Sequence, residues 1–187
     1  MDRRARIVDL VARLGLERRD EPFTLTSGER SHEYIDGKKA LARGADLRLA
    51  GEAAVDALAE LGVHEYDAAG GLTMGADPLA HAIAIVADVA WFSVRKEAKG
   101  HGQRRSVEGA RLEAGARVVL VDDVVTTGGS IQQAFHVLDA LRIVVVGAVT
   151  LVDRGDVAGE FFADHGVAYA PLASYRDLEI PPVGVDA

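Results

Sequence analysis

The sequence predicts an α/β fold, a parallel β-sheet flanked by helices, and two observations predict it. Apolar segments of strand length alternate with segments whose apolar residues recur at helical spacing, an order typical of βα units. The clearest strand, residues 118–121, is a continuous apolar run, as expected of a strand buried on both faces of a parallel sheet. Turns that follow parallel strands gather at the carboxyl edge of the sheet. We therefore expect the regions around Gly70, Arg95, Asp122 and Arg154 to converge there.

Length, composition and charge limit the class of protein. The chain has 187 residues, 49% of them hydrophobic, which suits a single domain, residues 1–187, with its own core. With 29 acidic and 21 basic side chains the formal net charge is −8, which argues against binding of nucleic acid or an anionic membrane. The longest apolar run, residues 143–152, is too short for a bilayer, which needs about 20 residues, and we expect no signal peptide. Cysteine is absent, which fits a reducing, cytoplasmic location.

The first third of the chain predicts two helices separated by a hairpin. Residues 3–14 predict an amphipathic helix. Its apolar stripe consists of Ile7, Leu10, Val11 and Leu14. Residues 23–28 alternate apolar and polar side chains, and a short extended segment follows at residues 33–36. Residues 46–61 predict a second helix, with Asp46 as its N-cap and Gly62 at its end.

The middle of the chain predicts two strands and a helix. Residues 67–71 form a short strand that runs into a glycine-rich loop. Asp77 and Pro78 begin a helix, because proline suits the first helical position. His81, on this mostly apolar helix, is interpreted as a packed or partly exposed residue rather than a ligand. Residues 91–94 predict the next strand.

The last part of the chain predicts a strand, a helix and a final strand. These are residues 143–152, 157–165 and 167–172, with Gly166 ending the helix and a proline-rich tail following the last strand. Strands and helices therefore continue to alternate to the end of the chain.

Two adjacent carboxylates, Asp122 and Asp123, follow the buried strand directly. Side chains alternate across a strand, so the two acids cannot both reach the same solvent, and an unpaired buried carboxylate is costly. We therefore expect both to lie at the open end of the strand with a functional role. An ordinary strand-turn-helix connection would leave them unexplained.

A small turn rich in hydroxyls and glycine, residues 126–130, comes next and leads into a helical pattern from Ile131 to Leu141. Strand, turn and helix N-terminus together form a phosphate site from backbone N–H groups and the helix dipole. Neither GxxxxGK[ST] nor GxGxxG occurs in the chain, so this is not a common nucleotide-binding turn. Two acids ahead of an anion site suit a ligand with a phosphate and nearby vicinal hydroxyls, because carboxylates accept hydrogen bonds from hydroxyls.

Positive charge gathers in residues 95–105, RKEAKGHGQRR, although the chain as a whole is acidic. A solvated run of charges is the usual explanation for such a segment. Its place after a strand, the glycines around His101 and the missing apolar period favour a cationic loop that closes over a polyphosphate and excludes water. We expect residues 96–106 to form this lid.

Arg154 lies just beyond the strand at residues 143–152, in the sequence Asp-Arg-Gly. One interpretation is an exposed loop arginine. The other is a guanidinium fork that binds a planar carboxylate through two hydrogen bonds. The local pattern leaves both open.

Motifs in four places resemble the type I phosphoribosyltransferases, and among them the orotate phosphoribosyltransferases. Residues 122–130 are similar to the family signature for phosphoribosyl diphosphate (PRPP). FTLTSG at residues 23–28, followed by Tyr-x-Asp, resembles the opening of the orotate enzymes, and RKEAKGHG resembles their catalytic loop. The resemblance runs from Phe23 to Asp177. It implies the type I phosphoribosyltransferase fold, a small N-terminal hood contributed mainly by residues 20–40, and a homodimer that shares its catalytic loop.

The implied reaction transfers the 5-phosphoribosyl group from PRPP to orotate, giving orotidine 5′-monophosphate and pyrophosphate in pyrimidine biosynthesis, with Mg²⁺ as cofactor. By resemblance the catalytic residues are Lys99, His101, Asp122 and Asp123. The implied PRPP-binding residues are Arg95, Lys96, Lys99, His101, Asp122, Asp123, Val124, Val125, Thr126, Thr127, Gly128, Gly129 and Ser130. Thr126 and Arg154 are the implied orotate-binding residues. Mg²⁺ is expected to arrive with PRPP near the acidic pair, and no direct metal ligand is assigned.

Two positions depart from the family pattern, because many relatives carry lysine where this chain has Thr26 and Met74. Lys38 and Lys39 are neighbouring cations that could replace the missing charge. Two other functions stay open: a phosphoribosyltransferase for another base, and a non-catalytic regulator that senses PRPP. A transcriptional regulator would need a DNA-binding module, for which the chain has no room, and the intact segment 95–101 favours an enzyme.

Overall fold

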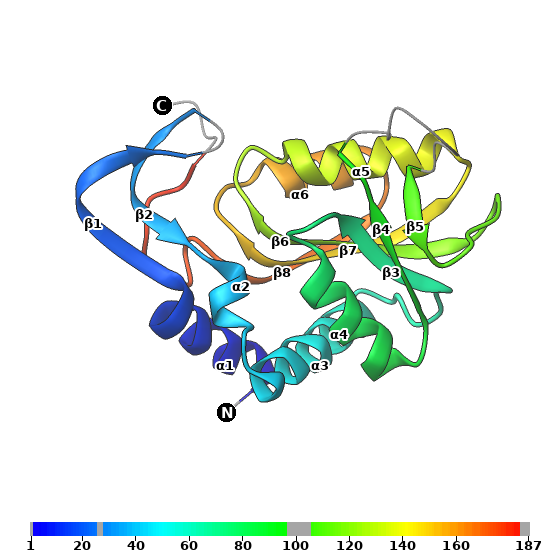
Figure 1. Ribbon diagram of the computed structural model, residues 1–187, viewed down its shortest axis with the longest axis horizontal. Coiled ribbons are helices and arrows are strands. Elements are labelled where there is room, and N and C mark those ends of the chain that lie inside the picture. Colours follow the sequence, from blue (N-terminus) through cyan, green and yellow to red (C-terminus); the bar gives the residue numbers. More distant parts are fainter. Residues whose placement is uncertain (1, 26–27, 97–105, 184–187) are drawn as a thin grey trace.

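The computed structural model describes residues 2–25, 28–96 and 106–183, and these form a six-stranded sheet, a separate two-stranded hairpin and the helices around them (Figure 1). All neighbours in the main sheet pair in parallel except β5, which is antiparallel to β4. In spatial order the strands are β5 (Val107–Gly109), β4 (Ala90–Val94), β3 (Ala68–Leu72), β6 (Arg117–Val125), β7 (Val144–Asp153) and β8 (Ala168–Ser174). The predicted α/β architecture is thus confirmed as a mostly parallel sheet.

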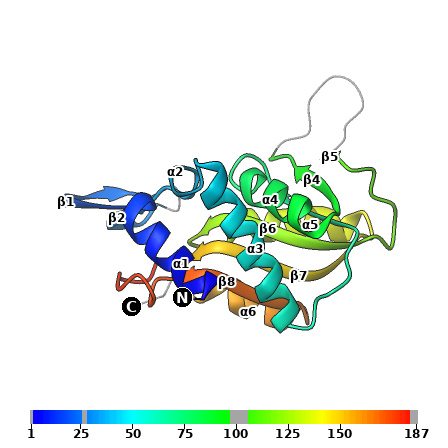
Figure 2. The same cartoon turned by 90° about the horizontal axis from the view of Figure 1, so that it is seen from below.

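Helices cover both faces of this sheet. Figures 1 and 2 show α1, α3 and α4 on one side and α5 and α6 on the other. Their bounds are α1 (Arg3–Leu10), α2 (Gly37–Ala40), α3 (Gly44–Glu60), α4 (Asp77–Ala87), α5 (Gly129–Ala140) and α6 (Val157–Asp164), with a π-helical turn η1 (Val11–Gly15) after α1. Among the residues that the structure describes, no helix is long and apolar enough to cross a bilayer.

The central strand β6 explains the two-sided packing. Its apolar residues alternate: Val119 and Val121 belong to the core beneath α3 and α4, while Val118 and Leu120 belong to the core beneath α5 and α6. All are fully buried. A continuous apolar run at period two therefore supplies both cores, as expected for a strand in the middle of a parallel sheet.

The hairpin of β1 (Leu16–Thr24) and β2 (Arg30–Ile35) projects beyond the end of the main sheet (Figure 1). Its base is fixed by a hydrogen bond from Asp36 N to Gly15 O at 2.9 Å. Asp36 then caps the short helix α2 through Oδ1, which accepts from Lys39 N at 3.1 Å. A Cβ added to Gly37 would lie 3.1 Å from Cβ of Asp123, so α2 packs closely against the end of β6.

Some sequence-based expectations need correction. Leu14 is 37% exposed although the rest of its predicted stripe is buried, because the α-helical period changes to a π-helical turn after Leu10. Asp46 does not cap α3; Arg43 occupies the N-cap, and Asp46 lies in the first turn, where its charge still favours the dipole. The antiparallel strand β5 was not expected.

Candidate active site

Two adjoining cavities lie at the carboxyl edge of β3, β6 and β7, where the expected regions converge. One has a volume of about 360 Å³ and reaches from the turn at residues 126–130, which we call the signature turn, to the β1–β2 hairpin. The other, of about 400 Å³, lies along the turn that leads into α5. The residues that line both are Lys96, Asp122, Val124, Thr126 and Ser130. Arg95 lines neither cavity.

The acidic pair forms the floor between the cavities, and β6 continues through it to Val125 rather than ending before it. Asp122 is 4% exposed, whereas Asp123 is half-buried. Asp122 Oδ1 accepts from Asp123 N at 3.0 Å, and Asp123 Oδ1 accepts from Val124 N at 2.8 Å. The amides of the strand end therefore fix the orientation of both carboxylates.

The electrostatics of the pair differ from one acid to the other. Burial, followed by the charge of neighbouring Asp123, raises the pKa of Asp122 to about 7. Lys38 lies beside Asp123, with Nζ 3.4 Å from Oδ2. Burial opposes the charge on Lys38, but the carboxylate of Asp123 outweighs it, so the pKa of Lys38 is raised. A cation or hydroxyl donor in the cavity would favour the charged form of Asp122.

The turn at residues 126–130 has the expected shape of an anion cradle. Gly128 adopts a left-handed conformation with φ 76°, and α5 begins immediately after it without a side-chain cap. The first N–H groups of a helix have no intrahelical partners, and they carry the positive end of the dipole. Gly129 and Ser130 are exposed at this point, so the N–H groups of the first turn can meet an anion in the second cavity.

A second glycine-containing loop, residues 73–75 after β3, lies against the acidic pair. Thr73, Met74 and Gly75 line the first cavity. A Cβ on Gly75 would lie 2.6 Å from Asp123 Oδ1, so a larger residue at this position would displace the carboxylate of Asp123. The expected helix start at Asp77 has a further role that the local pattern did not indicate. Its carboxylate accepts from Thr73 Oγ1 at 2.7 Å and from Ser93 Oγ at 2.8 Å.

Arg154 is one of the largest fully buried side chains, at 1% exposure, so the interpretation as an exposed loop arginine is wrong. Nη1 donates to Glu33 O at 2.8 Å, and Nη2 lies 3.4 Å from Ser31 Oγ and 3.3 Å from Pro181 O. Nε is buried without a hydrogen-bond partner among the described residues. Burial lowers the pKa of Arg154 from its ordinary value, but an arginine stays charged. The side chain lines the first cavity next to Tyr34.

Of the basic segment, residues 95–105, the structure describes only Arg95 and Lys96. Lys96 lines both cavities, and its carbonyl accepts from Gln133 Nε2 at 3.1 Å. Arg95 instead forms a two-point ion pair with Glu108 of β5, at 2.7 Å from Nε and 2.8 Å from Nη2. Lys99, His101 and most of the predicted lid lie outside the described residues, as does Thr26.

Two further residues of the predicted PRPP site, Val125 and Thr127, differ in exposure. Val125 is buried beneath the signature turn, while Thr127 lines the second cavity. His81 is partly exposed and packs its ring edge-on against Trp91, with centroids 4.6 Å apart, which agrees with the predicted packed or partly exposed position. Lys39 pairs with Glu17 at 2.8 Å and does not line the cavity; of the two neighbouring lysines only Lys38 does.

Comparison with known proteins agrees with this geometry. Residues 51–160 match the phosphoribosyl transferase domain family. The chain is 40% identical over 180 residues to the orotate phosphoribosyltransferase of Corynebacterium glutamicum (strain R), covering 95% of each chain. It is 36% identical over 181 residues to that of Aquifex aeolicus (strain VF5), covering 94% of this chain and 97% of the relative.

Solved structures lead to the same family. The Mycobacterium tuberculosis H37Rv orotate phosphoribosyltransferase in complex with PRPP superposes with a TM-score of 0.76 at 33% identity, over 96% of this chain and 100% of that one. A phosphoribosyltransferase from Corynebacterium diphtheriae superposes with a TM-score of 0.80, also at 33% identity, with coverage of 96% and 100%. The match to the family over residues 51–160, together with relatives that match over nearly the full chain, places this protein in the orotate phosphoribosyltransferase family.

Proposed function

We propose a role for each part of this site in the family reaction, the transfer of the 5-phosphoribosyl group from PRPP to orotate. The products are orotidine 5′-monophosphate and pyrophosphate, and the reaction belongs to pyrimidine biosynthesis. The observation that carries the proposal is the convergence of an uncapped helix N-terminus, two carboxylates and a buried arginine on two adjoining cavities. The helix N-terminus suits the 5′-phosphate, the two carboxylates suit the ribose hydroxyls, and the arginine suits the carboxylate of the base.

PRPP would lie across the acidic pair. We place its 5′-phosphate in the cradle of residues 126–130, where backbone N–H groups, the side chains of Thr126, Thr127 and Ser130, and the α5 dipole favour an anion. The ribose hydroxyls then reach Asp122 and Asp123, which accept hydrogen bonds from them.

The described residues suit Mg²⁺ only if the substrate supplies some of its ligands. No three His, Cys, Asp or Glu side chains of the described ranges are grouped to hold a metal ion by themselves. Asp122 and Asp123 offer oxygen ligands, and Mg²⁺ is commonly bound through one or two carboxylates together with substrate phosphates. When bound, the ion would stabilise the charge that develops on the leaving diphosphate.

The diphosphate would lie toward the loop of residues 73–75 and Lys96, which line the same cavity. Positive charge builds on the ribose as the bond to the anomeric carbon breaks, and negative charge builds on the diphosphate. Lys96 favours the leaving group, and we assign Lys99 and His101 the same role by family resemblance. Met74 is 70% exposed and supplies no charge, so Lys38, near Asp123, is the cation that we place on this side.

Orotate would occupy the part of the first cavity between Thr126, Tyr34 and Arg154. Orotate is already an anion at neutral pH, so no strong base is needed. The buried Nε–H of Arg154 is an unused donor, and a carboxylate is the acceptor that a guanidinium binds most strongly. Uracil lacks that carboxylate and would leave the donor unsatisfied.

One assay tests the function directly. Purified protein with PRPP and Mg²⁺ is expected to consume orotate and to form pyrophosphate in equal amounts, with uracil, adenine and guanine as matched alternative bases. Omission of Mg²⁺ should abolish most of the activity. Use of uracil or a purine as efficiently as orotate would leave only the broader phosphoribosyltransferase assignment, and no turnover of any base would favour a PRPP-sensing regulator.

We also propose a cytoplasmic homodimer whose basic loop completes the neighbour's site. The absence of cysteine supports a reducing compartment. Support for the shared loop comes from Arg95, which is turned to Glu108 and lines neither cavity of its own chain. Mixing an inactive Asp123→Asn chain with an inactive Lys99→Ala chain should restore activity, because a hybrid dimer contains one intact site. No recovery despite confirmed subunit exchange would show that each chain uses its own loop.

A further inference from the structure

Arg154 belongs to a turn, residues 153–156, that is held from behind by the end of the chain. Arg154 N donates to Val125 O at 2.8 Å, and Arg154 O accepts from Val183 N at 2.7 Å. Asp153 O accepts from Tyr175 N at 2.8 Å. The turn that carries the guanidinium is therefore hydrogen-bonded both to β6 and to the C-terminal segment, which we define as residues 174–183.

A buried polar chain holds the first residue of this turn. Tyr169 Oη donates to Asp153 Oδ2 at 2.7 Å, and Asp153 Oδ1 accepts from Gly155 N at 3.1 Å. A phenol has a single proton, so the contact of 2.9 Å between Tyr169 Oη and Thr150 Oγ1 must be donated by Thr150. Asp153 is 4% exposed and Thr150 fully buried. This carboxylate thus links the last strand of the sheet to the backbone on the far side of Arg154.

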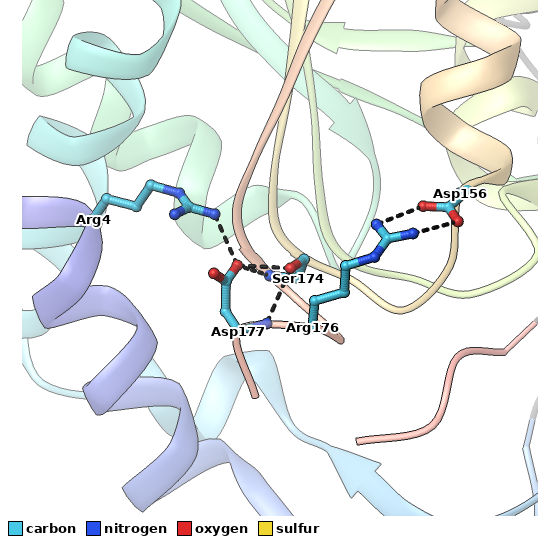
Figure 3. A network of polar contacts seen from close by, with 5 residues as sticks. All are labelled: Arg4, Asp156, Ser174, Arg176 and Asp177. Atoms are coloured by element: carbon cyan, nitrogen blue, oxygen red, sulfur yellow. Dashed lines mark hydrogen bonds and ion pairs between the residues drawn. The ribbon is translucent and has the colours of Figure 1, made fainter. Parts of the chain in front are cut away.

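The C-terminal segment is itself anchored at several points. Leu178 and Ile180 are buried in the core beneath α3 and α4. Figure 3 shows Asp177 between Arg4 of α1 and Ser174, with contacts of 2.8 Å to Arg4 Nη2 and 2.7 Å to Ser174 Oγ. From this fixed segment Pro181 O accepts from Arg154 Nη2, and Val183 O lies so near Gly155 that an added Cβ would clash with it.

The other side of the turn is held by an exposed pair. Asp156 accepts from both terminal nitrogens of Arg176 at 3.0 Å (Figure 3). It also accepts from Tyr175 Oη at 3.2 Å. The Arg176 side chain is 64% exposed, and exposed ion pairs contribute little. Position at the Arg154 turn therefore depends mainly on the buried Tyr169–Asp153 bond and on residues 181–183.

We propose that Tyr169, through Asp153, and residues 181–183, through the Arg154 backbone and guanidinium, are positioning elements for recognition of the base carboxylate. Neither touches the cavity that takes PRPP. The proposal rests on the role given above to Arg154 in binding orotate. It assigns to the end of the chain a function in choosing the base, in addition to its part in the core.

Tyr169→Phe is the sharpest single change. It removes one hydroxyl and keeps the ring, which stacks on Phe162 with centroids 5.3 Å apart. We expect the KM for orotate to rise roughly three- to tenfold, as for the loss of one hydrogen bond that aligns a charged group, while the KM for PRPP stays within about twofold. The preference for orotate over uracil should fall by the same factor. A rise of both Michaelis constants together, or none in either, would overturn the positioning role of Tyr169.

Two comparisons separate positioning from general destabilisation. Tyr175→Phe is the matched control, because it also removes a tyrosine hydroxyl from an aspartate, but at the exposed Asp156, and it should leave both Michaelis constants unchanged. In a double-mutant cycle, Tyr169→Phe should have no further effect on the KM for orotate once Arg154 is replaced by alanine. Additive effects of the two changes would mean that Tyr169 acts independently of Arg154.

A pair of truncations tests the positioning role of the C-terminal segment without any core substitution. It remains informative if Tyr169→Phe folds poorly. A chain ending at Ile180 loses the contacts of Pro181 and Val183 with the Arg154 turn, and should show a KM for orotate raised at least as much as in Tyr169→Phe. A chain ending at Val183 keeps them and should match the full chain. Equal kinetics of the two truncations would overturn the role of residues 181–183. If Arg154→Ala leaves the KM for orotate unchanged, the role of Arg154 fails as well; if it raises that constant while the full-length Tyr169→Phe and the truncations do not, only this inference fails.

Discussion

The two ends of the active site are built in opposite ways. At the base end, Arg154 is fully buried, and protein carbonyls, including one from the C-terminal segment, hold its guanidinium. At the phosphate end, the α5 N-terminus has no side-chain cap, and Gly129 and Ser130 face solvent. Protein contacts alone organise the first end, whereas under the proposed roles the 5′-phosphate would complete the second. A change at the base end should therefore alter both stability and binding, and a change at the phosphate end should alter binding alone.

Arg154→Ala is the strongest test of this contrast. It removes a buried side chain and leaves Glu33 O and Pro181 O without their donor, so the free energy of unfolding should fall by about 3–5 kcal/mol. The KM for orotate should rise far more than that for PRPP. Chemical denaturation and steady-state kinetics measure the two effects, and Arg176→Ala, at the exposed pair nearby, serves as the control. A stable variant with ordinary orotate kinetics would contradict the contrast at its base end.

The acidic pair lies between the two ends, and its loss should affect turnover more than folding. In Asp122→Asn and Asp123→Asn a neutral amide replaces each acceptor that we propose for the ribose hydroxyls. We expect kcat/KM for PRPP to fall on the order of a hundredfold, equivalent to about 3 kcal/mol. Thermal unfolding should show that both variants remain folded. Wild-type kinetics in both would remove the acids from the mechanism.

The same pair predicts how stability depends on pH. The pKa of Asp122 is about 7 in the folded chain against an ordinary value of 3.8, so between these values the folded state holds more of this proton than the unfolded state. The stability that protonated Asp122 contributes is present below pH 4 and is lost as the pH rises through 7. Relative to Asp122→Asn, the wild type should lose on the order of 4 kcal/mol across this window, because each pKa unit corresponds to about 1.4 kcal/mol.

Urea denaturation at several pH values, without ligand, measures this difference. Asp177→Asn is a useful comparison, because the pKa of Asp177 is lowered by the hydrogen bonds of Ser174 and by Arg4, which outweigh burial, so its dependence on pH should have the opposite sign. A constant difference between the wild type and Asp122→Asn would mean that Asp122 stays ionised throughout.

Ser130→Ala should have the smallest effect on stability. Its side chain is exposed at the first turn of α5 and caps nothing, so the free energy of unfolding should change by less than about 0.5 kcal/mol. The KM for PRPP should still rise several-fold, because we propose this hydroxyl as one donor to the 5′-phosphate. Calorimetric titration with PRPP, and with inorganic phosphate as a simpler probe, checks both expectations. A large loss of stability would show that the phosphate end, like the base end, is held together by protein contacts.

The amino-acid sequence by itself determined those secondary-structure elements and turns that depend only on residues adjacent in the chain. The apolar period of β6, the acids that follow it and the glycine turn before α5 are contiguous, so their local chemistry predicts a strand, a cradle and a helix. The order of strands and helices follows from the same short-range patterns. The family resemblance rests on such contiguous motifs too, and the comparisons confirm it.

Only the tertiary structure decided the contacts between distant segments. Arg154 bonds to Glu33, 121 residues away in the chain, and Tyr169 reaches Asp153 from the next strand. Nothing next to Arg154 in the sequence distinguishes a buried arginine from an exposed one, because its burial is produced by the hairpin and the C-terminal segment. Lys38 likewise lies beside Asp123 only because α2 packs against the end of β6. Short-range periodicity specifies elements, while the partners of a buried charge depend on which elements the fold brings together.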